Sequence, residues 1–168
     1  MLNIDYIQIF HNLPPEIAVF FISMIPVAEL RASIPIALTI YKMDIVPTIL
    51  FAVLGNIIPM IFIVYFIDPV SKFLMKHFKF FNKFFKWIFK RTSIKFEGKY
   101  ERYGSIALIL FVAIPLPITG SWTGALASFL FQIPQKKAAI LITIGVIIAA
   151  LIVTFITQTA IGTFLLLK

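Results

Sequence analysis

Two charged residues, Glu29 and Arg31, stand two positions apart inside an otherwise apolar segment. Ionisable side chains in an apolar environment are costly and commonly mark a functional site. On a regular helix residues at this spacing do not face each other, whereas in an unwound segment between Pro26 and Pro35 both could reach one cavity. There a partly desolvated carboxylate could take up and release a proton, and the guanidinium could bind an anionic group by a forked contact. The alternative is a structural ion pair that pins the segment.

A second apolar segment is broken by residues that disfavour a regular helix, namely Pro115, Pro117, Gly120 and Gly124. Next to them, Thr119, Gly120 and Ser121 offer backbone N–H groups and hydroxyls that could complete a binding site. Trp122 could form a wall of the same cavity, and a packing or interfacial role is an equal alternative. We therefore expect two loops, one in each half of the chain, that together shape a substrate or proton site.

Asn56 is a polar residue in the middle of a long apolar stretch, beside Gly55 and close to Pro59. A side-chain amide in such a place needs a hydrogen-bonding partner. A bond to a neighbouring helix and a contact to a substrate both satisfy that need, and the sequence leaves the two open.

The composition is that of an integral membrane protein. Hydrophobic residues make up 61% of the 168 residues and charged residues 13%, against about 25% charged residues in soluble domains. Too few charges remain to cover a water-facing surface. The chain has no cysteine and two distant histidines, His11 and His77, so we expect no metal site and no cofactor. Phosphate-binding loops, nucleophile elbows and paired carboxylates are missing from the sequence, which argues against an enzyme.

The two halves of the chain carry the same order of features. The string IPVAELRASIPIAL begins at Ile25, and IPLPITGSWTGALA begins at Ile114, 89 residues later. Each is followed by an uncharged stretch long enough to span a bilayer, 46–67 and 138–167, with Gly55 and Gly145 90 residues apart. Breaks at corresponding positions of two halves are typical of transporter binding sites. We expect one membrane domain, 1–168, composed of a first repeat (1–69), a basic linker (70–102) and a second repeat (103–168).

The broken segments allow two topologies. Each is either a re-entrant helical hairpin or one kinked transmembrane helix. Hairpins give two crossings and place the basic linker and Lys136-Lys137 on one face, which the positive-inside rule makes cytoplasmic, with both termini outside. Four full spans put Lys136-Lys137 outside, against that rule. The expected fold is therefore an all-α integral membrane protein, an inverted repeat of two hairpins each followed by a transmembrane helix.

The linker carries a regular stripe of basic residues. The spacing of 4, 3, 4, 3 and 4 predicts one face of a single amphipathic helix lying in the bilayer interface, with lysines on anionic headgroups and aromatic residues in the lipid. The stripe consists of Lys72, Lys76, Lys79, Lys83, Lys86 and Lys90. Because a membrane explains this pattern, we expect no nucleic-acid partner. Leu2, Tyr6, Ile9 and Leu13 predict a second, short interfacial helix at the N-terminus.

These motifs resemble the putative small multidrug export protein family, and more distantly the DedA-like (VTT-domain) membrane proteins. The resemblance rests on PVAELRASIPIAL, LGNIIP, the basic linker and RYGSIALILFVAIPLPITGSWTGALAS. It implies two re-entrant hairpins, each packed with a transmembrane helix, and places Glu29 and Arg31 in the first loop motif. Pro115, Pro117, Gly120, Trp122 and Gly124 match the second loop, which lacks the arginine of many DedA-like proteins.

Taken together, these features predict a multi-pass secondary transporter in a prokaryotic plasma membrane. We expect it to export a small molecule of the multidrug type, with proton coupling as one possibility, and to work as a homodimer. Two alternatives stay open. One is a translocator of an anionic lipid such as a polyprenyl phosphate, and the other is a non-transporting membrane scaffold.

Overall fold

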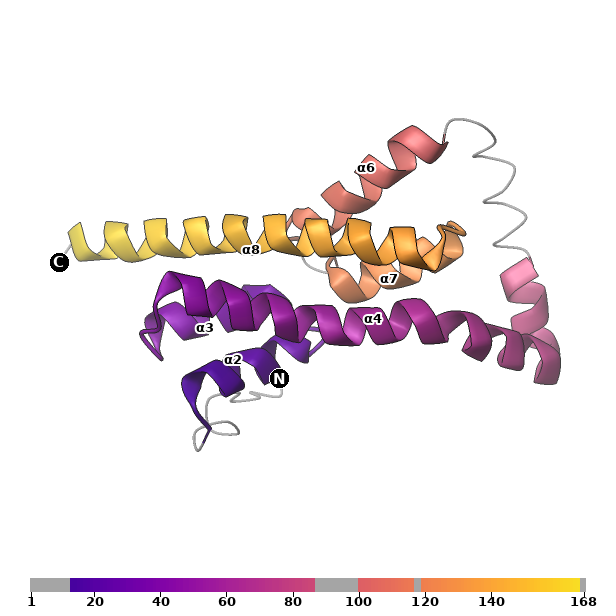
Figure 1. Cartoon of the computed structure of the whole chain (residues 1–168), viewed down its shortest axis with the longest axis horizontal. Coiled ribbons are helices and arrows are strands. Elements are labelled where there is room, and N and C mark those ends of the chain that lie inside the picture. The colour runs from indigo at the N-terminus through magenta and orange to yellow at the C-terminus, as the bar shows by residue number, and fades with distance from the viewer. Residues whose placement is uncertain (1–12, 87–99, 117–118, 167–168) are drawn as a thin grey trace. The chain divides into compact units, whose positions relative to one another are not determined.

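The computed structural model describes residues 13–86, 100–116 and 119–166, and the regular structure within these ranges is helical (Figure 1). The predicted N-terminal interfacial helix, Lys90 and Pro117 lie outside the described residues. Two short helices precede each of two long ones, in the order α2, α3, α4 and then α6, α7, α8. An all-helical fold was expected from the apolar segments and is confirmed.

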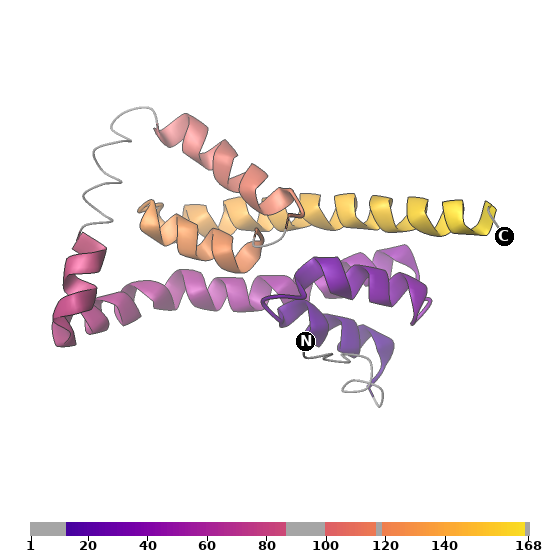
Figure 2. The same ribbon diagram turned by 180° about the vertical axis from the view of Figure 1, so that it is seen from behind.

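Helices α2 (Pro15–Met24) and α3 (Glu29–Thr39) pack against each other, side by side in both views (Figures 1 and 2). A proline at its first position starts α2 where the missing N–H costs nothing. The chain leaves the helical conformation only at residues 25–28. Pro35 lies inside α3, so the prediction of an unwound segment between Pro26 and Pro35 is wrong from Glu29 onward. The carbonyl of Pro35 accepts a hydrogen bond of 2.7 Å from the hydroxyl of Thr39, one turn further along α3.

Helices α6 (Tyr100–Ala113) and α7 (Ser121–Leu130) also pack against each other. The break between them begins at Ile114, as the prolines predicted. Gly120 precedes α7 with φ 155° and ψ −167°, a conformation that is essentially confined to glycine. The second broken segment is therefore a pair of helices joined by a loop.

Helices α4 (Ile45–His77) and α8 (Gln135–Leu166) are the two described helices long and apolar enough to cross a membrane. Both carry large apolar side chains that are exposed along their length, such as Phe62 at 59% and Phe155 at 74%. Side chains of this kind fit a lipid environment and not an aqueous one. The two predicted spans are thus confirmed as long apolar helices.

The ends of these helices differ from the predictions. Helix α4 continues through Asp68 and Pro69, beyond the uncharged stretch 46–67, because a helix can bridge one missing N–H when neighbouring groups compensate. The Ser71 hydroxyl donates to the Asp68 carbonyl at 2.8 Å, and Lys72 Nζ lies 2.7 Å from the Asp68 carboxylate. Gln135, Lys136 and Lys137 precede the uncharged stretch 138–167, and they form the first turn of α8.

The basic linker is not one helix. Its first lysines, Lys72 and Lys76, belong to the end of α4, the helix breaks at Phe78, and a short helix follows over 79–86. The short helix packs on α7 through the rings of Phe85 and Phe129, whose centroids are 6.0 Å apart. The prediction of a continuous stripe is therefore wrong at Phe78, although its lysines up to Lys86 are all exposed.

By its internal contacts the chain forms two compact units. The first comprises Met1–Ile58 and Ile147–Lys168, and the second comprises Pro59–Val146. Each unit therefore holds one pair of short helices, the first part of the long helix that follows this pair, and the last part of the other long helix. The core of the first unit centres on Val19, Ile22 and Ile34, and that of the second on Val112, Ile142 and Val146.

Candidate functional site

The first loop places a carboxylate in the interior of the first unit. Glu29 is the first residue of α3 and is 7% exposed. Its backbone has φ 43°, a left-handed conformation that costs an L-residue roughly 1–2 kcal/mol. Strained backbone of this kind is concentrated at functional sites. The N-terminus of a helix also favours a negative charge, so α3 helps this position to hold an ionised carboxylate.

Arg31 lies within the first turn of α3 and is partly exposed. Arg31 therefore stands on the helical first turn of α3, whereas Glu29, with φ 43°, stands at the point where the chain enters that helix. A cavity shared by Glu29 and Arg31 would therefore lie at the N-terminal end of α3.

A polar contact ties α2 to α4 next to this loop. The Ser23 hydroxyl donates to the carbonyl of Ala52 at 2.6 Å, and the Asn56 amide nitrogen donates to the carbonyl of Ser23 at 3.2 Å. Ser23 and Asn56 are both fully buried. Of the two roles left open for Asn56, the structure displays the helix-to-helix bond. Ser23 was missed by the sequence reasoning, although a serine within an apolar helix is a usable signal.

Gly55 lets the two helices approach closely at this contact. A Cβ added there would lie 2.1 Å from the carbonyl oxygen of Phe20. No side chain larger than hydrogen fits unless α2 moves. The hydrogen bonds and the close backbone approach together fix the end of α2, and hence the turn that presents Glu29.

In the second unit, Thr119 closes its own loop. Its hydroxyl donates toward the carbonyls of Ile114 and Leu116, at 2.8 and 2.9 Å, and accepts from the Leu116 N–H at 3.2 Å. These bonds occupy the hydroxyl that was expected to serve a ligand. Ser121 is 1% exposed at the start of α7, and Trp122 follows it with partial exposure.

A glycine contact recurs in the second unit. A Cβ on Gly145 of α8 would lie 2.9 Å from the carbonyl oxygen of Ile109 and 2.8 Å from Cβ of Val112. A Cβ on Gly124 of α7 would meet a methyl of Val112 at 2.5 Å. Gly124 was expected to shape the loop, but it lies inside α7 and allows close helix packing.

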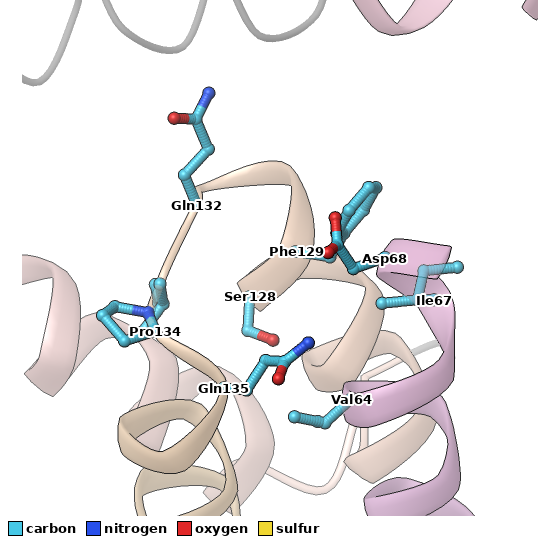
Figure 3. Close-up of a pocket in the computed structure, with 9 residues that line it drawn as sticks. Val64, Ile67, Asp68, Ser128, Phe129, Gln132, Pro134 and Gln135 are labelled. Atoms are coloured by element: carbon cyan, nitrogen blue, oxygen red, sulfur yellow. The ribbon is translucent and has the colours of Figure 1, made fainter. Parts of the chain in front are cut away.

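The second unit also contains a cavity of ≈ 590 Å³ that the sequence reasoning did not assign. Figure 3 shows Asp68 from α4, Ser128 from α7 and Gln135 at the start of α8 around it, with the Gln132 side chain directed away. The lining is Val64, Ile67, Asp68, Ser128, Phe129, Gln132, Ile133, Pro134 and Gln135. Its size and its mixture of apolar and polar groups suit a small organic molecule. The sequence signal that could have indicated this cavity is the presence of polar residues at the ends of apolar segments.

The predicted site residues thus fall into two groups. Pro26, Glu29, Arg31 and Asn56 belong to the first unit, and Thr119, Gly120, Ser121 and Trp122 belong to the second. Within the first unit, Asn56 joins α4 to the end of α2. Within the second, Thr119 and Gly120 build the loop that leads into α7.

The chain matches a known protein family. The family model described as "Putative small multi-drug export protein" matches residues 29–152. The chain belongs to this family. The match covers about three quarters of the chain and includes Glu29, Arg31, Asn56 and the second loop. Comparison with curated proteins and with solved structures gave no match. Family membership and the exposed apolar faces of α4 and α8 together place the protein in a membrane.

Proposed function

We propose that this small multi-drug export family protein is a secondary transporter that exports a small molecule from a prokaryotic cell, with Glu29 as its proton-coupling group. The observation that carries the proposal is the buried side chain of Glu29, which stands directly after the break between α2 and α3 on a strained, left-handed backbone. A buried ionisable group inside an apolar segment suggests a function, because its surroundings must compensate its charge. The protonation of Glu29 can therefore be coupled to the change between an inward-facing and an outward-facing site.

Helix boundaries support an internal repeat. Helix α4 begins at Ile45 and α8 at Gln135, 90 residues later. Helices α2 and α6 end at Met24 and Ala113, 89 residues apart. Between the short and the long helix of each half, one residue takes a left-handed conformation, Lys42 with φ 50° and Gln132 with φ 57°. Helix starts, helix ends and left-handed residues all repeat after 89 or 90 residues. Chance similarity between apolar strings would not produce this agreement.

Packing repeats with the same offset. Gly55 lies against the carbonyl of Phe20, and Gly145 lies against the carbonyl of Ile109, so both partners shift together. The buried face of α4 recurs on α8 at positions 90 residues later. These buried positions are Thr48, Ala52, Asn56 and Met60 on α4, and Ala138, Ile142, Val146 and Ala150 on α8.

The contents of the units support an inverted arrangement. Each unit combines the first part of one long helix with the last part of the other. Within each unit, the part that comes from the start of one long helix is therefore combined with the part that comes from the end of the other, as an inverted repeat requires. Inverted repeats of this type allow a central site to open alternately to the two faces.

Helix length supports re-entrant hairpins. The four short helices have 10 to 14 residues and reach about 15–21 Å at 1.5 Å per residue, less than the ~30 Å of a hydrocarbon core. Each therefore turns back within the membrane, where its broken backbone must be buried in protein or line a wet cavity. In this topology α4 and α8 are the two crossings, the 72–86 segment is cytoplasmic, and a homodimer encloses the pathway.

Transport by purified protein tests the proposal. Proteoliposomes with and without a pH gradient are loaded with a fluorescent organic cation or, in parallel, with a fluorescent short-chain anionic lipid. Gradient-dependent movement of the cation supports export. Movement of the lipid alone replaces the substrate class with an anionic lipid, and no movement of either favours a membrane scaffold.

A further inference from the structure

The break at Phe78 turns the lysine stripe into a concave surface. Between the end of α4 and the helix over 79–86 lies a cavity of ≈ 510 Å³. It is lined by Met75, Lys76, His77, Lys79, Asn82, Lys83 and Lys86. All of these residues belong to the second unit. On a continuous helix these lysines would form a convex stripe, and the break is what gives them a shared cavity.

The cavity is strongly cationic. Four of its described lining residues are lysines, and these lining residues include no carboxylate. The carboxylate of Asp68 is bound at 2.7 Å to Lys72, which lies outside the lining. Ammonium groups that share one concave surface repel each other, and an anion between them removes this cost. Their number favours a ligand with more than one negative charge.

Short backbone contacts hold the concave shape. The Asn82 amide nitrogen donates across the break to the carbonyl of Met75 at 3.0 Å, and the Phe78 N–H donates to Leu74 at 2.9 Å. The ring of His77 is held in place by its Nδ1–H, which donates to the carbonyl of Phe73 at 2.9 Å. Asn82 and His77 both line the cavity, so its shape does not depend on the lysines alone.

Aromatic side chains show where the ligand comes from. Phe73, Phe78, Phe80 and Phe84 on the same segment are 59%, 52%, 74% and 43% exposed. Exposed phenyl rings beside lysines are typical of a segment at the headgroup level of a bilayer. The phosphate of a lipid is therefore within reach of this cavity.

We propose that the cavity is a defined binding site for the headgroup of an anionic lipid that carries two phosphates. The proposal goes beyond a general attraction of the stripe to an anionic surface. It depends on the membrane location of the chain and stands whether or not the chain transports a substrate.

Lipid binding to the full-length chain in detergent, titrated and read by native mass spectrometry, tests the site. Cardiolipin, with two phosphates, is compared with phosphatidylglycerol, with one, at equal total charge. We expect saturable binding of one cardiolipin per chain and at least tenfold weaker binding of phosphatidylglycerol. Lys79→Gln with Lys83→Gln should weaken cardiolipin binding about thirtyfold, since a lysine near an anionic headgroup contributes about 1 kcal/mol.

Two variants separate a site from a diffuse charge effect. Lys136→Gln with Lys137→Gln removes the same charge outside the lining and should change the affinity less than threefold. Asn82→Leu keeps every lysine but removes the bond across the break, and should weaken binding about tenfold. Thermal unfolding of each variant shows whether it is folded. If the double glutamine variant is unstable, Lys79→Arg with Lys83→Arg tests the same positions, and it should retain binding because the charges are kept.

The proposal is overturned if the two double variants weaken binding equally and Asn82→Leu has no effect, because diffuse charge then explains the affinity. A parallel titration with inorganic diphosphate identifies the source of the phosphate. Diphosphate binding that is tighter than cardiolipin binding, and that Lys79→Gln with Lys83→Gln abolishes, would assign the cavity to a soluble ligand and exclude the lipid.

Discussion

The amide nitrogen of Asn56 lies 3.2 Å from the carbonyl oxygen of Ser23, and both residues are fully buried between α2 and α4. At the positions 89 or 90 residues later, α6 and α8 carry Val112 and Val146, which are also buried. The same place in the two halves is thus polar in the first and apolar in the second. The polar version holds the end of the helix that leads to Glu29.

Asn56→Leu should destabilise the protein by about 1 kcal/mol, because hydrogen bonds between helices in membranes contribute about 0.6–1.7 kcal/mol. Ser23→Ala, which removes a 2.6 Å bond to Ala52, should have an effect of similar size. Thermal or denaturant unfolding in detergent measures both. The two changes share one network, so the double variant should lose less than the sum of the single losses. Strict additivity would show that the two bonds act independently.

Gly55→Ala should destabilise the protein by about 3 kcal/mol or more, because the new Cβ overlaps a backbone oxygen that only a shift of α2 can relieve. Gly162→Ala is the matched control, since a Cβ added to Gly162 of α8 would have no neighbouring atom within 4 Å. There alanine should be neutral or stabilising by about 0.5–1 kcal/mol. Unfolding of both variants in the same detergent provides the comparison. Equal stability of the two would mean that α2 and α4 do not approach closely.

Single cysteines test the topology, because the chain has none of its own. Asn3→Cys should react with an impermeant thiol reagent in whole cells, and Lys83→Cys should react only after the membrane is permeabilised. These outcomes follow from two crossings with the basic segment inside. Labelling of Lys83→Cys but not of Asn3→Cys would invert the arrangement. Protection of both would favour four full spans.

Glu29→Gln should lower transport at least tenfold while the protein still inserts and unfolds at an unchanged temperature. Glutamine keeps the size and the hydrogen bonding of the side chain but cannot change its protonation state. Glu16→Gln is the matched control, because Glu16 is likewise acidic in the first turn of a short helix of the same unit. It should leave transport unchanged. Flux into proteoliposomes, measured with and without a pH gradient, distinguishes the two variants.

Arg31→Lys should also lower transport at least tenfold, since lysine retains the charge but not the planar fork of donors. A purely structural ion pair predicts a different result. Removing one partner would then destabilise the protein by about 3–5 kcal/mol if the pair is well buried, and replacing both would restore stability. The double variant Glu29→Gln with Arg31→Met decides between these roles. If it is stable and active, the two charges do not carry the mechanism.

Composition and spacing determined much of this protein without coordinates. The scarcity of charge predicted a membrane protein, two uncharged stretches predicted α4 and α8, and prolines and glycines predicted the two breaks. These inferences succeed because burial in lipid and backbone geometry are local demands on residue type. The similar strings that begin at Ile25 and Ile114 are 89 residues apart, and the ends of α2 and α6 have the same separation.

Only the tertiary structure decided how each break is built and which polar groups meet. It limited the first break to residues 25–28, placed Pro35 and Gly124 inside helices, and used the Thr119 hydroxyl to close its own loop. It also bent the lysine stripe at Phe78, where periodicity predicted continuity. The physical reason is that a spacing pattern records which face a residue occupies but not where a helix ends. The end depends on whether freed backbone groups find partners, and those partners are supplied by segments that only folding brings together.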